Sequence, residues 1–213
     1  MKKILPIVLF FTVLGSIASA QKVRVNAYTA YVFDDKIDSY YDANSYYEGT
    51  IKGGFQWGVG LEYMLDRTKG IELKYLRQDT KAPMTYYREG VKEKTFDVAV
   101  NYILLGGSNY FETSSGKFEP YLGFGLGCAI IDVSNPDGGS GSSTKFAWDI
   151  KGGSNIWLNE KIGIKLQVEL LSAVQSAGGG LYFGTGGASA GLSSYSSMLQ
   201  FGMGGGLVFK MGN

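Results

Sequence analysis

The 213-residue chain contains no histidine and only one cysteine, Cys128. Without histidine it lacks the usual general base, the usual partner that activates a serine, and the commonest metal ligand. We therefore expect no enzymatic activity, no catalytic residue, no metal site and no cofactor. A single cysteine allows no disulfide within the chain, which excludes a disulfide-stapled secreted domain. The net charge of +1 provides no basic footprint for nucleic acid, so we expect no nucleic-acid partner.

Long apolar runs are scarce, and the clearest one lies at the N-terminus. Two lysines precede the apolar stretch 4–15, and Ala18-Ser19-Ala20 provides the small residues of a cleavage site. This pattern predicts an export signal over residues 1–20 and one mature domain over 21–213. After Gln21 no stretch is continuously apolar for the length of a membrane helix, so any membrane crossing must use strands.

The mature chain instead alternates between apolar and polar or small residues. From Ile51 to Leu65, for example, Phe55, Trp57 and Val59 alternate with Gln56, Gly58 and Gly60. About ten residues of tilted strand cross a bilayer, and a sheet in lipid must close on itself to pair its edges. The pattern therefore predicts an all-β protein, a closed antiparallel up-and-down eight-stranded transmembrane β-barrel. The predicted strands are 22–33, 51–65, 71–78, 96–104, 118–130, 145–158, 162–170 and 195–210.

We expect the apolar face of each strand to contact lipid and the other face to line the lumen. In the fourth segment this rule places Phe96, Val98, Val100, Tyr102 and Leu104 outside and Asp97 inside. Lys52 is likewise expected inside. The predicted lumen charge network consists of Glu62, Glu72, Lys74, Asp97, Asp149, Lys151, Lys165 and Glu169.

This network predicts a plugged lumen. Eight strands leave an interior just wide enough for side chains to fill, and an unpaired charge in such a space is costly. The inward charges are nearly balanced in sign, so we expect them to pair across the lumen. The alternative is that they line a narrow proton or ion path.

The predicted connections alternate in length along the chain. The short ones are 66–69, 112–116 and 159–161, and the long ones are 34–50, 81–94, 133–143 and 172–194. Short turns face the periplasm and long loops face the exterior in barrels of the bacterial outer membrane. Both ends of the predicted barrel should therefore lie on the periplasmic side.

Three segments carry a resemblance to known barrels: Gly60-Leu61-Glu62-Tyr63, the run from Pro120 to Gly127, and the closing run from Phe201 to Phe209. With these segments the chain resembles the small outer-membrane barrels of the OmpA-transmembrane and OmpX type, and especially the outer membrane protein β-barrel domain family. The resemblance implies integral insertion in the outer membrane of a Gram-negative cell envelope. It also implies two partners, the outer-membrane lipids and the barrel assembly machinery.

The first two long connections are rich in tyrosine, which supplies rigid amphipathic contact area at recognition surfaces. The candidate binding residues are Tyr40, Tyr41, Tyr46, Tyr47, Tyr86 and Tyr87. We expect a structural or surface-binding barrel whose long loops bind an extracellular or envelope protein. Two alternatives remain: the tyrosines form an aromatic girdle at the lipid headgroups, or the protein is a small porin-like channel.

Overall fold

The computed structural model describes residues 22–42, 45–87, 91–135, 138–174, 180–184, 187–191 and 198–211. The predicted export signal, residues 1–20, lies outside the described residues. Within the described ranges, no helix has the length and apolar character needed to cross a membrane.

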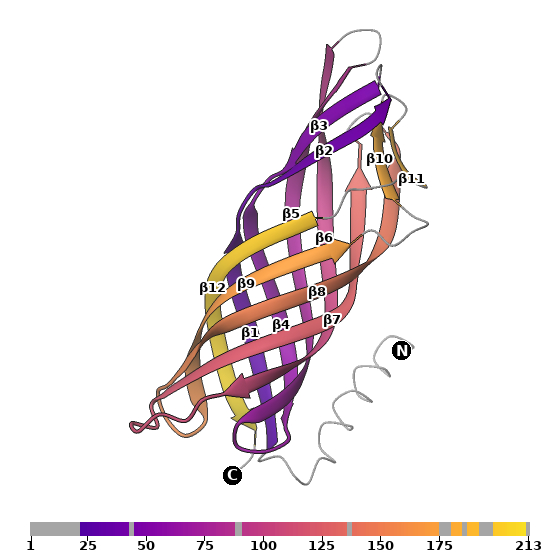
Figure 1. Ribbon diagram of the computed structural model, residues 1–213. Helices are drawn as coiled ribbons and strands as arrows, with labels where there is room; N and C mark the ends of the chain where they lie inside the picture. The colour runs from indigo at the N-terminus through magenta and orange to yellow at the C-terminus, as the bar shows by residue number, and fades with distance from the viewer. Residues whose placement is uncertain are drawn as a thin grey trace, which may run out of the picture.

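Eight strands form a closed antiparallel ring (Figure 1), which confirms the predicted barrel. Each strand pairs with the next around the ring, and the additional pairing of β5 with β6 closes it. In ring order the strands are β1 (Val23–Val32), β4 (Gly54–Met64), β5 (Lys69–Tyr87), β6 (Val91–Tyr110), β7 (Phe118–Ser134), β8 (Ser140–Trp157), β9 (Ile162–Val174) and β12 (Met198–Met211).

One end of the barrel carries the three short turns, and we call it the short-turn end. In the β4–β5 turn, Asp66 Oδ1 accepts hydrogen bonds from the amides of Thr68 at 2.7 Å and Lys69 at 2.8 Å. In the β8–β9 turn, Asn159 Oδ1 accepts from the amides of Lys161 at 2.9 Å and Ile162 at 2.8 Å. The same side-chain geometry therefore closes both hairpins, because Asp and Asn readily bond to backbone amides two residues on.

The opposite, long-loop end contains more strand than the sequence predicts. Within the predicted loop 34–50, β2 (Asp35–Asp42) and β3 (Ser45–Ile51) form a hairpin, and β3 pairs with β5 beyond the end of β4. The predicted loop 81–94 is also largely strand, because β5 and β6 run through it in one register. A separate two-stranded sheet is formed by β10 (Gly180–Gly184) and β11 (Gly187–Gly191).

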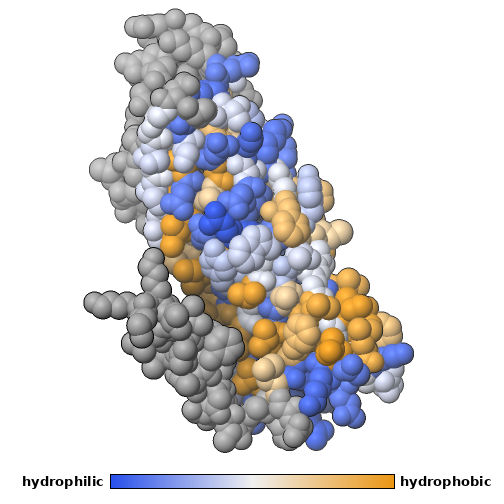
Figure 2. All heavy atoms as spheres, turned by 180° about the vertical axis from the view of Figure 1, so that it is seen from behind, coloured by the Kyte–Doolittle hydropathy of each residue, from blue (hydrophilic) through white to orange (hydrophobic). Residues whose placement is uncertain are grey.

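Large apolar side chains cover the outside of the barrel near the short-turn end. Figure 2 shows them as a band, with hydrophilic residues above it and a smaller hydrophilic group at the turns. Every strand of the ring contributes at least one exposed apolar side chain, for example Tyr31, Leu61, Leu73, Leu105, Leu126, Ile150, Leu166 and Met203. The band has the composition of a lipid-facing surface.

The predicted orientation of the fourth strand is wrong. In β6 the side chains of Phe96, Val98, Val100, Tyr102 and Leu104 are buried inside the barrel, whereas Asp97 is exposed on the outside. Alternation distinguishes the two faces of a strand but does not say which face meets lipid. The interior of the long-loop half is apolar, so the apolar face of β6 turns inward there.

The lumen is consequently divided into two zones. The zone near the short-turn end, which we call the polar lumen zone, holds buried charged, amide and tyrosine side chains from all eight strands. The zone near the long-loop end, the apolar lumen zone, is packed with side chains such as Met84, Phe96, Val98, Ile131 and Leu171. Outside the apolar lumen zone the sheet carries exposed charges, among them Asp79, Lys81, Asp97 and Asp132.

Candidate functional site: the polar lumen zone

The network begins at the short-turn end with Arg24 on β1. Its guanidinium donates two hydrogen bonds to the Glu119 carboxylate of β7, at 2.9 and 3.0 Å. Glu119 also accepts from Asn155 Nδ2 at 2.8 Å. The guanidinium carbon lies 4.7 Å from the ring centre of Tyr110 and 5.3 Å from that of Trp157. A bidentate, aromatic-flanked guanidinium of this kind holds one orientation.

Glu62 and Tyr110 form a second contact at this level. The Tyr110 hydroxyl lies 2.6 Å from Glu62 Oε1 and 2.8 Å from Oε2 and donates to that carboxylate. Glu62 is fully buried, so its charge is stabilised by the hydroxyl and by the nearby Arg24 rather than by water.

Glu72 on β5 is a further buried carboxylate of the polar lumen zone. It accepts a hydrogen bond from Lys151 Nζ at 2.5 Å, one from Asn26 Nδ2 at 2.7 Å and one from the Tyr28 hydroxyl. Lys151 lies on β8 and both other donors lie on β1, so one carboxylate ties together three strands.

Lys74, two residues further along β5, makes the next bridge. Its ammonium donates to Asp149 Oδ2 at 2.7 Å and to Glu169 Oε1. Glu169 also accepts from Gln167 Nε2 at 3.0 Å, and Gln167 in turn accepts from the Tyr121 hydroxyl at 2.7 Å. All of these side chains are buried, so the positive charge is shared by two carboxylates in a space from which water is largely excluded.

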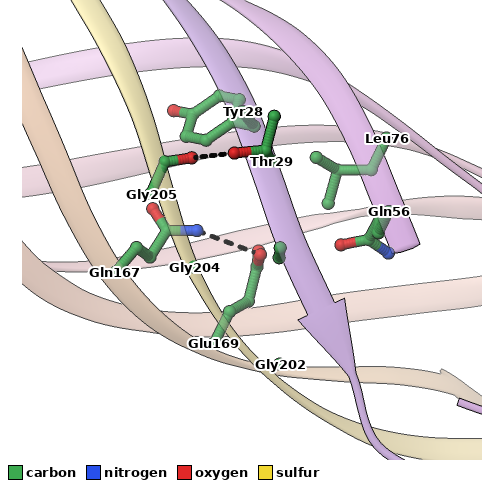
Figure 3. Close-up of a pocket in the computed structure, with 10 residues that line it drawn as sticks. Tyr28, Thr29, Gln56, Leu76, Gln167, Glu169, Gly202, Gly204 and Gly205 are labelled. Carbon is green, nitrogen blue, oxygen red and sulfur yellow. Dashed lines mark hydrogen bonds between the residues drawn. The ribbon is translucent and has the colours of Figure 1, made fainter. Parts of the chain in front are cut away.

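A layer of amides marks the border with the apolar lumen zone. Gln200 Nε2 donates to Gln78 Oε1 at 3.0 Å, and the Tyr102 hydroxyl donates to Gln200 Oε1 at 3.1 Å. Next to it lies a cavity of about 10 Å³, bordered by Gln56, Gln167 and Glu169 (Figure 3). That volume fits about one water molecule, so this cavity is too small for a hydrated ion.

These bridges span the barrel. In the ring order, β1 lies opposite β7, and β5 lies opposite β9. The pair Arg24–Glu119 therefore connects opposite walls, and so does Lys74–Glu169. Each of these two contacts crosses the polar lumen zone from one wall to the other.

Inward glycines make room for the network. A Cβ atom at Gly60 would overlap Oε1 of Glu72, and one at Gly125 would overlap Oδ1 of Asp149. At Gly123 the nearest atom to such a Cβ would be Lys151 Cε, at 2.7 Å. Glycine at these positions lets large charged side chains cross a narrow lumen. Glycine within a strand often marks a place where another group comes close to the backbone.

Seven of the eight predicted network residues lie inside the barrel. Six of them make the contacts described above, and the seventh, Lys165, places its ammonium 4.3 Å from the ring centre of Tyr121 and 5.9 Å from that of Tyr28. The inward assignment of Asp97 is wrong, because β6 has the opposite orientation.

Lys52 is another departure from the predicted orientation. It lies on the outside, where its ammonium pairs with Asp34 Oδ2 at 3.0 Å. The strand is interrupted at Lys52 and Gly53, so Ile51 points inward although Phe55 points outward. The Gly53 amide and the Lys52 ammonium together lower the pKa of Asp34 from its ordinary value.

The candidate binding tyrosines lie on strands and not on irregular loops. Tyr46 and Tyr47 on β3 pair with Tyr87 and Tyr86 on β5, and Tyr40 on β2 pairs with Tyr46. Tyr41 lies in β2 as well. The backbone therefore brings the first two long connections side by side. For these six tyrosines the structure describes the backbone and not the side chains.

The predicted network omitted the hydroxyl donors and amides that complete it. Tyr28 and Asn26 share the inward face of β1 with Arg24, so strand parity alone could have included them. Tyr110 gives a weaker signal, because the Gly106-Gly107 pair before it interrupts the alternation of side chains near the end of β6. Among the described residues, no group of three or more His, Cys, Asp or Glu side chains is placed to hold a metal ion.

Comparisons with known proteins agree with this architecture. Neisserial surface protein A from Neisseria is 13% identical over 88% of this chain and 96% of its own, with a TM-score of 0.55. OprG of Pseudomonas aeruginosa is 13% identical over 89% and 96%, with a TM-score of 0.56. The outer membrane protease OmpT of Escherichia coli is 7% identical over 90% and 97%, with a TM-score of 0.54. At such identities the likeness concerns the fold alone.

No curated protein matches this chain in sequence. A family model does match it, over residues 7–193, and its description is outer membrane protein beta-barrel domain. That match covers most of the chain and agrees with the closed ring, the apolar band and the resemblance noted in the sequence. The chain therefore belongs to the outer membrane protein β-barrel domain family, whose members are barrels of the bacterial outer membrane.

Proposed function

We propose that this protein is a non-conducting, non-enzymatic outer-membrane barrel that presents its extracellular β-structure to a partner. The observation that carries the proposal is the pair of cross-lumen bridges, Arg24–Glu119 and Lys74–Glu169, between opposite walls. The partners of both bridges are largely shielded from water, which would otherwise stabilise the separated charges, so thermal motion rarely opens such a bridge. The apolar lumen zone adds a second barrier, since its buried side chains are a poor environment for ions.

The extracellular end supports a binding role. By the rule for outer-membrane barrels, the long-loop end faces the exterior. There β2, β3, β5 and β6 form a continuous sheet beyond the apolar band, so the tyrosine positions lie on a scaffold held by backbone hydrogen bonds. Tyr40, Tyr46 and Tyr87 occupy one row of its register. A regular scaffold of this kind positions contact residues with less loss of entropy on binding than flexible loops would.

Conductance tests the closed lumen. Purified barrel in planar bilayers should show little steady current. A Glu72→Ala, Lys74→Ala, Lys151→Ala variant should show brief openings, because three buried bridging side chains are shortened together while the apolar lumen zone stays packed. Lys81→Ala on the outer face of β5 is the control and should remain silent. Large, stable channels from the unaltered protein would instead favour the porin-like alternative.

Crosslinking on whole cells tests the binding role. Replacing Tyr40, Tyr46 and Tyr87 by serine should reduce the yield of crosslinked partner while the barrel keeps its heat-modifiable mobility on detergent gels. Serine at Tyr75, an outward residue of the same β5 strand nearer the membrane, is the matched control. If the serine variant captures the same partners in the same yield, the tyrosines are not the contact residues.

A further inference from the structure

A groove interrupts the lipid-facing surface at the short-turn end, across β5, β6 and β7. It is an open surface groove, not an enclosed pocket, with a volume of about 560 Å³. The residues around it are Leu65, Lys69, Gly70, Ile71, Gly107, Ser108, Asn109, Leu122, Gly123 and Phe124. None of them belongs to the cross-lumen bridges.

The groove exists because one outward position lacks a side chain. Ile71, Gly107 and Phe124 form one row of the register, and Gly107 is the middle residue. With neighbouring strands about 4.8 Å apart, the backbones at Ile71 and Phe124 are about 10 Å apart, and the residue between them has no side chain. The next row toward the barrel centre consists of Leu73, Leu105 and Leu126, which closes the groove in that direction.

The open end of the groove is polar and positively charged. The row nearest the turns is Lys69, Asn109 and Leu122. Arg67 and Lys69 make no ion pair with any described residue. Asp66, the neighbouring acid, accepts hydrogen bonds from the amides of Thr68 and Lys69. These bonds lower its pKa from the ordinary value, with Thr68 the larger cause, and the charge of Lys69 lowers it further.

The other two short turns differ in charge. The β6–β7 turn carries Glu112 and Lys117, and the β8–β9 turn carries Glu160 and Lys161, so each is balanced. Of the three turns, only the β4–β5 turn next to the groove has a surplus of positive charge. Cations at a membrane surface attract anionic lipid headgroups.

We propose that this groove is a specific seat for one anionic phospholipid of the periplasmic leaflet. The phosphate lies at Lys69 and Asn109, next to the turn that carries Arg67. The glycerol backbone and the start of an acyl chain lie over Gly107 between Ile71 and Phe124. Short turns of outer-membrane barrels face the periplasm, so the polar end of the groove is at the depth of the headgroups of that leaflet. The polar open end of the groove matches the phosphate headgroup of a phospholipid, and its apolar part around Gly107 matches the acyl chain.

Native mass spectrometry of the purified full-length protein tests the seat, with phosphatidylglycerol and phosphatidylcholine titrated into detergent micelles. We expect one tightly retained phosphatidylglycerol per barrel and weaker retention of phosphatidylcholine. Gly107→Leu should abolish the retained lipid by filling the groove; a Cβ at Gly107 has Gly70 O as its nearest atom, at 3.6 Å, so the backbone accommodates the change. Lys69→Gln should weaken retention about fivefold, the effect of one cation beside an anionic headgroup.

Two matched variants control for general effects. Val168→Leu adds bulk to the lipid-facing surface of β9, and Lys117→Gln removes a cation from the β6–β7 turn; both should retain the lipid. A phosphatidylglycerol with a photoactivatable group near the top of its acyl chain should crosslink to β6 or β7 around Gly107. Equal retention by Gly107→Leu and the unaltered protein would overturn the proposal. So would a dimer mass that disappears in Gly107→Leu, since the occupant would then be a second copy.

Discussion

The two halves of this barrel have opposite polarity. Near the short turns the outside is apolar and the lumen contains ion pairs, such as Lys74–Asp149. Near the long loops the outside carries charges, such as Asp97, and the lumen is packed with residues such as Phe96 and Val98. The reversal follows the solvent: lipid surrounds the first half, whereas water surrounds the second, and the interior takes the complementary character in each half. One continuous strand, β6, passes through both environments without changing its orientation.

Lys74→Met should have the largest effect, because it removes a cation shared by two buried carboxylates. We expect a loss of about 3–5 kcal/mol in the free energy of unfolding. Guanidinium unfolding of the barrel in phospholipid vesicles, followed by tryptophan fluorescence, measures this change. Lys81→Met, at an exposed position of the same strand, should change stability little. Equal losses in the two variants would contradict the importance of the buried bridge.

Leu104→Ala tests the other zone of the lumen and the orientation of β6. Leu104 is 1% exposed inside the barrel, whereas its neighbour Leu105 is 59% exposed toward lipid. Truncating Leu104 should cost about 2–5 kcal/mol, since both transfer energy and packing are lost. Leu105→Ala should cost less because it leaves no internal cavity. The reverse ranking in the same unfolding assay would restore the orientation that the sequence predicts.

Leu166→Arg tests the lipid-facing side of the polar lumen zone. Placing arginine on the lipid face costs about 2–4 kcal/mol near the middle of the bilayer. The adjacent Lys165→Arg keeps a cation inside the lumen and should be milder. Folding yield into vesicles and the unfolding midpoint both report the difference. If both variants fold and unfold alike, Leu166 does not face the hydrocarbon.

Gly125→Ala should have the smallest effect of this series, yet one clearly above its control. The added methyl overlaps Oδ1 of Asp149, and overpacking of this kind costs about 1–3 kcal/mol. Gly107→Ala, whose methyl would enter the outer groove, should be close to neutral. Thermal shifts of the unheated band on detergent gels compare the two variants. A neutral Gly125→Ala would mean that the charge network adjusts to the added methyl at little cost.

Particular residues show how far sequence reasoning extends. Alternation correctly placed Leu61, Leu73 and Leu166 outside and Glu72, Lys74 and Asp149 inside, because charged and apolar positions alternate clearly in these strands. It failed for Phe96 to Leu104 because it assumed that every apolar face meets lipid. It also failed at Lys52, where a break in the strand shifts the alternation by one position. The expected loops at 34–50 and 81–94 were wrong because their inward apolar residues, such as Ala82 and Met84, are too few to be recognised as a strand face among the polar residues around them.

The closed eight-stranded barrel and most of the charged residues that line it can be predicted from the sequence, because both depend on a local period of two residues and on the need to pair every strand edge in lipid. Which charges meet depends on the stagger between strands that are distant in the chain, so it is visible only in the folded barrel. Only the closed ring places Arg24 opposite Glu119 and Lys74 opposite Glu169. The register of the consecutive strands β5, β6 and β7 places Gly107 between Ile71 and Phe124, beside the positively charged turn.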